Sequence, residues 1–302
     1  MKIFRISIIL LVAAMLLVGC GTEAELGTKK NPIKMYFVPS MEAGKIVTSG
    51  QEIADYLTGK TGYQFKVAVP TSYASVIEAM GTKETDIAWL ATFAYILANE
   101  KFGAEVGLTT VRYGLEKYKG QFIARADSGI EKMEDIAGKT IAYTDAASTS
   151  GFIYPSAMLA QKNIKPKNYI FAGGHPQVVL SVYQGNADVG CTFWSPKDAD
   201  GNIHDARYAV KETFPDVEEK INIIGFTEWI PNDTVTFRKD FPADMKEKII
   251  SELMAYAKTP KGSETLVRLL QINDFVRGND ADYDVVRETL KSIDADAGDF
   301  LK

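Results

Sequence analysis

The sequence is poor in the side chains that bind transition metals. Its 302 residues include two histidines, His175 and His204, and two cysteines, Cys20 and Cys191. Zinc sites in proteins need several His, Cys or carboxylate ligands close together. A histidine-rich metal site is therefore excluded, although carboxylate sites are not. We expect neither a metal nor a cofactor.

The chain also lacks an excess of positive charge. Its 34 Lys and Arg residues face 39 Asp and Glu residues, which gives a net charge of −5. Nucleic-acid binding calls for a basic patch, so we do not expect a nucleic-acid partner. The 46% of hydrophobic and 24% of charged residues are ordinary for a soluble globular protein. The length leaves room for two domains.

The apolar run at residues 6–18 is too short to cross a bilayer comfortably. It follows Lys2 and Arg5. A membrane-spanning helix needs about 20 apolar residues. A shorter run behind basic residues is typical of a signal peptide, and it indicates export from the cytoplasm.

The apolar run ends in LVGC, residues 17–20. This tetrapeptide resembles a bacterial lipobox, which implies a signal peptide at 1–19 and lipidation of the Cys20 sulfur. An ordinary secretory peptide and an uncleaved anchor are the alternatives. With Cys20 acylated, Cys191 has no disulfide partner within the chain. The small polar residues of 20–31 are expected to be a tether between lipid and domain.

Strand-like and helix-like segments alternate through the first half of the mature chain, an order that predicts a parallel sheet with helices on both faces. The expected strands are 33–38, 63–69 and 86–90, and the expected helices are 46–57, 75–80 and 93–99.

The second half repeats this alternation, and the C-terminus is mostly helical. The segments are strands at 138–144, 169–171 and 188–193, helices at 130–137, 152–162 and 176–183, extended runs at 221–226 and 234–237, and terminal helices at 244–257, 263–270 and 282–293.

These units predict two lobes joined by two crossings. We assign 32–126 plus 233–302 to lobe 1 and 127–232 to lobe 2. The strand at 121–125 is expected to carry the chain forward, and 228–236 to bring it back. A cleft between two such lobes is a favoured place for a ligand.

Three hydroxyl residues follow one another in DAASTSGFIYP, residues 145–155. The turn leads from a strand into a helix, whose first N–H groups have no partners within the helix and attract anions. Ser148, Thr149 and Ser150 add hydroxyl donors, and Gly151 lets a ligand approach the backbone. No Lys or Arg lies between Lys139 and Lys162. The turn is therefore either a neutral site for a tetrahedral oxyanion or a plain helix cap.

Four motifs, one of them the hydroxyl turn, carry a resemblance to a known family. They are SYASVIEAM (72–80), DIAW (86–89), STSGFIYP (148–155) and IPNDTVTFRKD (230–240). Over residues 33–260 the chain resembles the phosphonate-, phosphite- or phosphate-binding component of ABC importers. The resemblance implies an α/β, two-lobed type II periplasmic-binding-protein fold that closes on its ligand.

The resemblance also implies ligand-binding positions. They are Tyr73 at a helix start, Tyr118 near the first crossing, Ser148, Thr149 and Ser150 on the phosphonate oxygens, His175 after a strand, and Asp233 at the return crossing. Asp233 is expected to accept a proton from the ligand.

One stretch departs from the family pattern. Relatives that bind an aminoalkyl phosphonate carry a glutamate where this chain has FWSP, residues 193–196. The missing carboxylate argues against 2-aminoethylphosphonate. We expect the bulky Trp194 to narrow the pocket, which favours phosphite, methylphosphonate or phosphate.

The sequence therefore predicts a lipid-anchored, extracytoplasmic binding protein. We expect a monomer that delivers a small phosphorus oxyanion to an ABC permease and its ATPase. The same fold with another organic solute, and a ligand sensor that feeds a histidine kinase, remain open. An enzyme has no support, because no catalytic constellation is recognisable.

Overall fold

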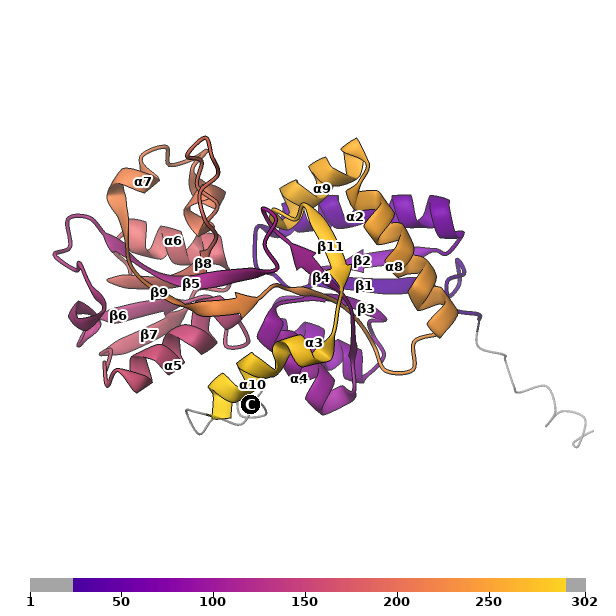
Figure 1. The fold of residues 1–302 in the computed structure, drawn as a ribbon, viewed down its shortest axis with the longest axis horizontal. Coiled ribbons are helices and arrows are strands. Elements are labelled where there is room, and N and C mark those ends of the chain that lie inside the picture. Colours follow the sequence, from indigo (N-terminus) through magenta and orange to yellow (C-terminus); the bar gives the residue numbers. More distant parts are fainter. Residues whose placement is uncertain (1–23, 292–302) are drawn as a thin grey trace, which may run out of the picture.

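The computed structural model describes residues 24–291 and shows two α/β lobes side by side (Figure 1). The sheet of lobe 1 has the strand order β11-β4-β10-β3-β1-β2. Its strands are β1 (Ile33–Phe37), β2 (Phe65–Ala68), β3 (Ile87–Leu90), β4 (Glu105–Val111), β10 (Thr234–Phe237) and β11 (Asp274–Arg277). The sheet is mixed: β1 is parallel to β2 and β3, whereas β10 and β11 run antiparallel to their neighbours.

The sheet of lobe 2 has the strand order β7-β6-β8-β5-β9. Its strands are β5 (Lys117–Arg125), β6 (Thr140–Tyr143), β7 (Asn168–Phe171), β8 (Val189–Trp194) and β9 (Ile221–Pro231). β5 pairs antiparallel with both β8 and β9. The strand expected to lie in the first crossing is therefore a central strand of lobe 2.

The two crossings lie at 112–116 and 232–233, between β4 and β5 and between β9 and β10. Asn232 joins them, because its side-chain amide donates to the carbonyls of Thr110 at 2.9 Å and Leu115 at 2.8 Å. Its backbone N–H donates to the carbonyl of Glu116. The hinge thus consists of two hydrogen-bonded segments.

Helices cover both faces of the lobe 1 sheet, as the alternation predicts. α2 (Ala43–Thr61), α8 (Ala243–Ala257) and α9 (Pro260–Leu270) pack on one face, and α3 (Tyr73–Gly81) and α4 (Thr92–Phe102) on the other (Figure 1). In α2 the buried Ile46, Ile53 and Leu57 recur at helical spacing. The helix ends at Gly62, which takes a left-handed φ of 81°.

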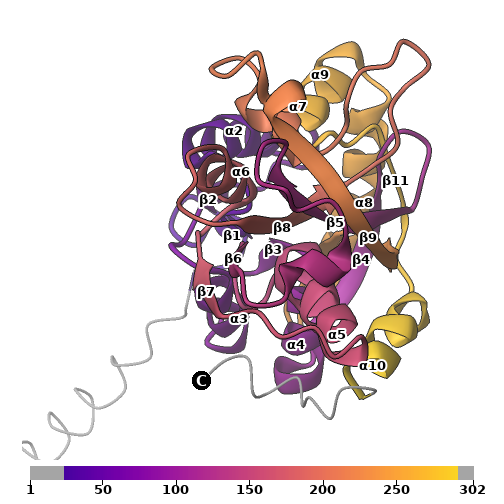
Figure 2. The ribbon, with the colours of Figure 1, turned by 90° about the vertical axis from the view of Figure 1, so that its left-hand side faces the viewer.

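Lobe 2 contains α5 (Tyr154–Gln161), α6 (His175–Tyr183) and α7 (Val217–Lys220). A π-helical turn, Thr149–Ile153, precedes α5. The sequence predicted a single helix at 152–162, whereas in the structure the residues after Ser148 first form this π-helical turn and α5 begins only at Tyr154. The last described helix, α10 (Asp284–Lys291), lies beside α4 and α5 (Figures 1 and 2).

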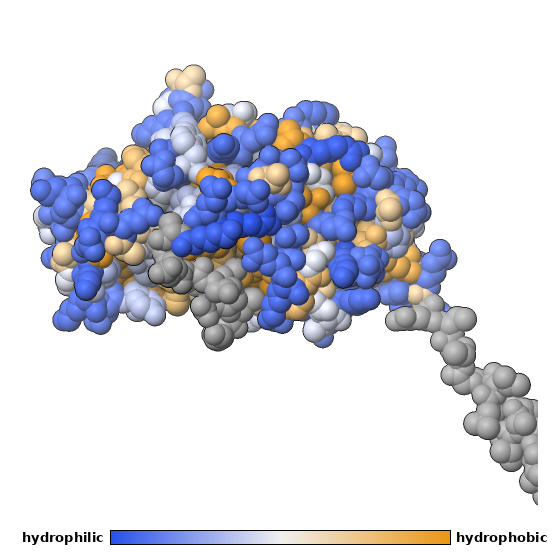
Figure 3. Space-filling model, turned by 60° about the horizontal axis from the view of Figure 1, so that its bottom comes forward, coloured by the Kyte–Doolittle hydropathy of each residue, from blue (hydrophilic) through white to orange (hydrophobic). Residues whose placement is uncertain are grey.

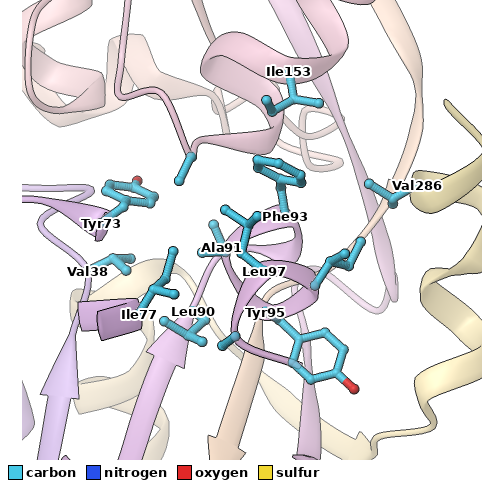
Figure 4. Packing of buried hydrophobic residues seen from close by; sticks show 14 of the residues in the cluster. Val38, Tyr73, Ile77, Leu90, Ala91, Phe93, Tyr95, Leu97, Ile153 and Val286 are labelled. Atoms are coloured by element: carbon cyan, nitrogen blue, oxygen red, sulfur yellow. The ribbon is translucent and has the colours of Figure 1, made fainter. Parts of the chain in front are cut away.

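One buried cluster extends across both lobes. Figure 4 shows Phe93 of α4 pointing toward Ile153 of lobe 2, and Val286 of α10 belongs to the same cluster. Phe93 and Val286 are fully buried. Burying such side chains stabilises by roughly 1.5–3 kcal/mol each, so the cluster favours contact between the lobes.

Residues 24–32, before β1, pack on lobe 1, although 24–31 were expected to be part of a tether. Leu26 packs on the lobe 1 core, and the carbonyl of Gly27 accepts a hydrogen bond from Gln64 at 2.8 Å. The predicted signal peptide and Cys20 lie outside the described residues. Within 24–291, no helix is long and apolar enough to cross a membrane. The face in Figure 3 is largely hydrophilic, with hydrophobic side chains scattered over it.

Candidate ligand-binding site

A cavity of about 1100 Å³ lies between the lobes. Six of the eight predicted ligand-binding residues line it: Tyr73, Tyr118, Ser148, Ser150, His175 and Asp233. They come from α3, β5, the π-helical turn, α6 and the return crossing. Segments far apart in sequence therefore meet at one place between the lobes.

The hydroxyl turn fits closely against its own strand. The Ser148 hydroxyl accepts a hydrogen bond from the Gly151 N–H at 3.2 Å. A Cβ added at Gly151 would lie 2.2 Å from Oγ1 of Thr144. Position 151 therefore needs glycine for a packing reason, in addition to any approach by a ligand. Ser148 acts as a helix cap and also lines the cavity.

Thr149 makes a contact between the lobes and does not line the cavity. Its hydroxyl oxygen accepts a hydrogen bond from the N–H of Phe93 at 2.8 Å. This N–H is near the start of α4, where helix donors have no partner within the helix. The middle residue of the Ser-Thr-Ser motif thus fastens lobe 2 to lobe 1, a role that the sequence alone did not indicate.

The two tyrosines of the site are buried and protonated. Burial and the charge of Asp145 raise the pKa of Tyr73 well above its usual value. Burial and the charge of Asp233 raise the pKa of Tyr118. At neutral pH both phenols keep their protons and can donate hydrogen bonds to an anion.

His175 is neutral. Burial, with a smaller contribution from the charge of Arg112, lowers its pKa to about 3. Its Nδ1 lies 3.2 Å from Oγ1 of Thr144, and its backbone N–H donates to the carbonyl of Ser40 at 3.0 Å. The latter bond connects α6 of lobe 2 to lobe 1. The imidazole therefore offers the cavity a hydrogen-bonding group without charge.

Arg112 is a cavity residue that the sequence analysis missed. Its guanidinium donates to Oδ2 of Asp233 at 2.6 Å, and its Nε donates to the carbonyl of Leu270 at 2.8 Å. It also lies over the ring of Tyr118, with 5.8 Å to the centroid. Its place in the site could not be read from the sequence, because β4, the strand that it follows, was itself missed. The site therefore contains a cation, paired with the predicted carboxylate.

Trp194 does not narrow the pocket, contrary to the expectation from sequence. Its ring packs against Phe226 with 4.8 Å between centroids, and Phe193 lines the cavity in its place. Neighbouring residues of a strand point to opposite faces of the sheet. Trp194 therefore lies on the face of β8 away from the cavity, and the argument from sequence for a small pocket no longer applies.

Two of the family motifs serve the fold. Asp86 of DIAW accepts a hydrogen bond from Nε of Arg238 at 2.8 Å and another from the N–H of Lys34 at 2.8 Å. Arg238 belongs to the FRKD end of the last motif. This ion pair ties β3 to the end of β10 inside lobe 1, away from the cavity.

The part of the chain that the structure describes has no cluster of three or more His, Cys, Asp or Glu residues suited to a metal ion. Within the same residues, Cys191 is buried and has a free thiol.

Residues 35–283 match the family described as the ABC transporter, phosphonate, periplasmic substrate-binding protein. The chain belongs to this family. Its members are binding proteins and not enzymes, in agreement with the expectation from sequence.

Two curated relatives agree with this assignment. The phosphate-import protein PhnD of Mycolicibacterium smegmatis is 29% identical over 175 residues, which are 53% of this chain and 54% of that protein. The phosphonates-binding periplasmic protein of Escherichia coli is 27% identical over 218 residues, which are 70% of this chain and 62% of that protein. The matched regions thus span less than two thirds of either relative.

A solved structure shows the same fold. PhnD1 of Prochlorococcus marinus, in complex with methylphosphonate, superposes with a TM-score of 0.75 and 14% identity, covering 87% of this chain and 98% of that one. The likeness confirms the two-lobed type II periplasmic-binding-protein fold.

Proposed function

We propose that this protein is the solute-binding component of an ABC importer and captures a phosphorus oxyanion in the cavity between its lobes. The observation that carries the proposal is the convergence of Ser148, Ser150, Tyr118 and neutral His175 on one cavity between two lobes. Family membership supports it, as does the methylphosphonate named for the Prochlorococcus protein.

In this proposal the Ser148 and Ser150 hydroxyls and the N–H groups of their turn donate to the ligand oxygens. The phenols of Tyr73 and Tyr118 and the imidazole of His175 complete the donor set. Hydrogen bonds to a charged oxygen are worth roughly 1.5–3 kcal/mol each, so a few of them hold the ion firmly. Thr149 acts through closure of the lobes.

Asp233 adds selectivity for a protonated ligand. Arg112 occupies its Oδ2. In the described part of the chain no hydrogen bond reaches Oδ1. A P–OH group can donate to Oδ1, whereas an unprotonated oxyanion would be repelled. The protein should therefore bind phosphite more tightly than sulfate at neutral pH, and Asp233→Asn should narrow that preference.

A thermal-shift panel tests the proposal directly. It contains phosphite, phosphate, methylphosphonate, ethylphosphonate, 2-aminoethylphosphonate and sulfate. A ligand at about 100 times its dissociation constant stabilises the fold by about 2.7 kcal/mol, which is readily measured. The proposal is refuted if no phosphorus compound raises the melting temperature. Sulfate binding as tight as phosphite binding would remove the role of Asp233.

The lipid anchor is the second part of the proposal. We infer an extracytoplasmic monomer, held at the membrane by a lipid on Cys20, that hands its ligand to a permease with an ATPase. Wild-type protein should begin at a lipid-modified Cys20 in mass spectrometry, and Cys20→Ser should carry no lipid. Recovery of an unmodified chain that keeps residues 1–19 would disprove the anchor.

A further inference from the structure

The cavity is much larger than a small oxyanion requires. Pockets for drug-sized ligands measure roughly 300–1,000 Å³. The volume here is about 1100 Å³. Ser148, Ser150, Tyr73 and Tyr118 are at most 5% exposed, so the predicted oxyanion position is the deep end of the cavity. An ion the size of phosphite or phosphate would fill only that end.

The large volume of the cavity does not arise because the lobes stand apart at the deep end. The N–H of Phe93 donates to Thr149 at 2.8 Å, and the N–H of His175 donates to the carbonyl of Ser40 at 3.0 Å. Both bonds join the two lobes. The lobes are therefore already in contact beside the oxyanion position.

Another contact, between the first crossing and lobe 2, lies at the wall of the cavity. The ring of Tyr113, in the 112–116 crossing, stacks on His204 of lobe 2 with 3.5 Å between centroids. Tyr113 takes a left-handed φ of 54°, uncommon for a residue other than glycine. Its N–H donates to Oδ1 of Asn273 at 2.6 Å, which holds it there. The rest of the cavity lies beyond the deep end.

The walls beyond the deep end include several apolar side chains. We call this part the outer chamber; it is lined by Met41, Leu180, Phe193, Tyr208, Val267 and Leu270. Tyr208 of lobe 2 is 56% exposed and Val267 of lobe 1 is 40% exposed. These two side chains come from opposite lobes and line one cavity. A ligand in the cavity would cover their exposed apolar surface.

Most charged side chains around the outer chamber have a partner of opposite charge. Arg112 pairs with Asp233, and His204 lies 3.3 Å from Asp198. The remaining charged lining residues are three cations and three anions: Lys45, Lys211, Arg268, Glu42, Glu212 and Glu264. Two of these cations pair with two of the anions, Lys45 with Glu42 and Arg268 with Glu264. The walls therefore suit an uncharged substituent.

We propose that the ligand is an organic phosphonate or phosphate monoester with a sizeable uncharged, apolar or aromatic substituent, which lies in the outer chamber. This inference rests on the proposed function, since the phosphorus oxyanion occupies the deep end. The substituent packs between Val267 of α9 and Phe193 and Tyr208 of lobe 2.

Calorimetric titration with methylphosphonate and phenylphosphonate tests the inference. The two probes share the oxyanion and differ in the substituent. We expect phenylphosphonate to bind at least about tenfold more tightly, because its ring is removed from water. Val267→Trp fills the outer chamber and should weaken phenylphosphonate binding by about tenfold or more, while methylphosphonate stays within about twofold. Val285→Trp, on an exposed position of α10 that does not line the cavity, is the matched control.

The outcomes separate the two proposals. If methylphosphonate binds as tightly as phenylphosphonate, the outer-chamber inference is wrong and the proposed function still stands. The same follows if Val267→Trp leaves the ratio of the two affinities unchanged. Failure of both probes to bind overturns the proposed function, and this inference with it. If the ratio of phenylphosphonate to methylphosphonate affinity falls as much in Val285→Trp as in Val267→Trp, this result also counts against the inference.

Discussion

Replacing Arg112 should lower both the free energy of unfolding and the affinity for the ligand, because its partner Asp233 is a largely buried carboxylate. The guanidinium of Arg112 is bound to Oδ2 of Asp233 at 2.6 Å, and the two side chains are 11% and 20% exposed. Breaking a buried pair by removing one partner costs about 3–5 kcal/mol, since the other charge is left without compensation. With this residual exposure we expect the lower end, about 3 kcal/mol for Arg112→Met.

A double-mutant cycle isolates the pair. Arg112→Met and Asp233→Asn each leave one member without its partner, whereas the double variant leaves neither charge behind. We expect the double variant to be at least about 1.5 kcal/mol more stable than the sum of the single losses predicts. Urea unfolding followed by circular dichroism at neutral pH measures all four proteins. Arg112→Lys, which keeps the charge, should lose less than Arg112→Met.

The ligand provides a second, independent readout. In Arg112→Met the carboxylate of Asp233 faces an anionic ligand without its cation, so affinity for the thermal-shift ligand should fall by at least about tenfold. The double variant should recover part of it. Strictly additive losses of stability, together with unchanged affinity in Arg112→Met, would refute the reasoning.

The remaining predictions concern three further buried groups. Asp86→Ala should lower the free energy of unfolding by about 3–5 kcal/mol, because Arg238 loses its partner; a loss below about 1 kcal/mol in urea unfolding would contradict this. Thr149→Ala should weaken ligand binding and also cost about 1–3 kcal/mol, since it removes the hydroxyl that accepts the hydrogen bond from the N–H of Phe93, whereas Thr149→Ser keeps the bond; calorimetry that finds the serine variant as impaired as alanine would argue against a hydroxyl role. Because the pKa of His175 is about 3 in the fold and 6.5 in an exposed histidine, the unfolded chain binds more protons between these values. The stability that the neutral His175 contributes is therefore fully present above about pH 6.5 and is lost as the pH falls toward 3. In His175→Gln the free energy of unfolding should therefore fall less steeply between about pH 7 and 4.

Much of the fold was predictable from local patterns. The apolar spacing of Ile46, Ile53 and Leu57 predicted a helix at 46–57, which α2 extends by a few residues at each end. Strands β1, β3 and β8 were found because short apolar runs end at turn residues. β4 and β11 were missed, since neither has a pattern that stands out without its neighbour in the sheet. β11 gains its place by pairing with β4, across more than 150 residues of sequence.

The site was predictable as a set of residues but not as a set of roles. Six of eight candidates line the cavity because strand ends and helix starts gather at the same edge of a sheet. Trp194 and Thr149 lie outside the lining, and each placement has a geometric cause. The alternation of a strand says that Phe193 and Trp194 face opposite ways, yet only the packed lobes decide which face meets the ligand.

The sequence by itself determined the alternation of elements, the hydroxyl turn at 148–150 and the excess of acidic residues, because these depend on neighbours along the chain. The tertiary structure alone decided the pairing of Arg112 with Asp233, 121 residues apart, and the partner of the Thr149 hydroxyl, 56 residues away. It also placed α9 at the wall of the cavity. Such contacts join segments whose separation in sequence carries no signal, so they exist only once the lobes have folded and met.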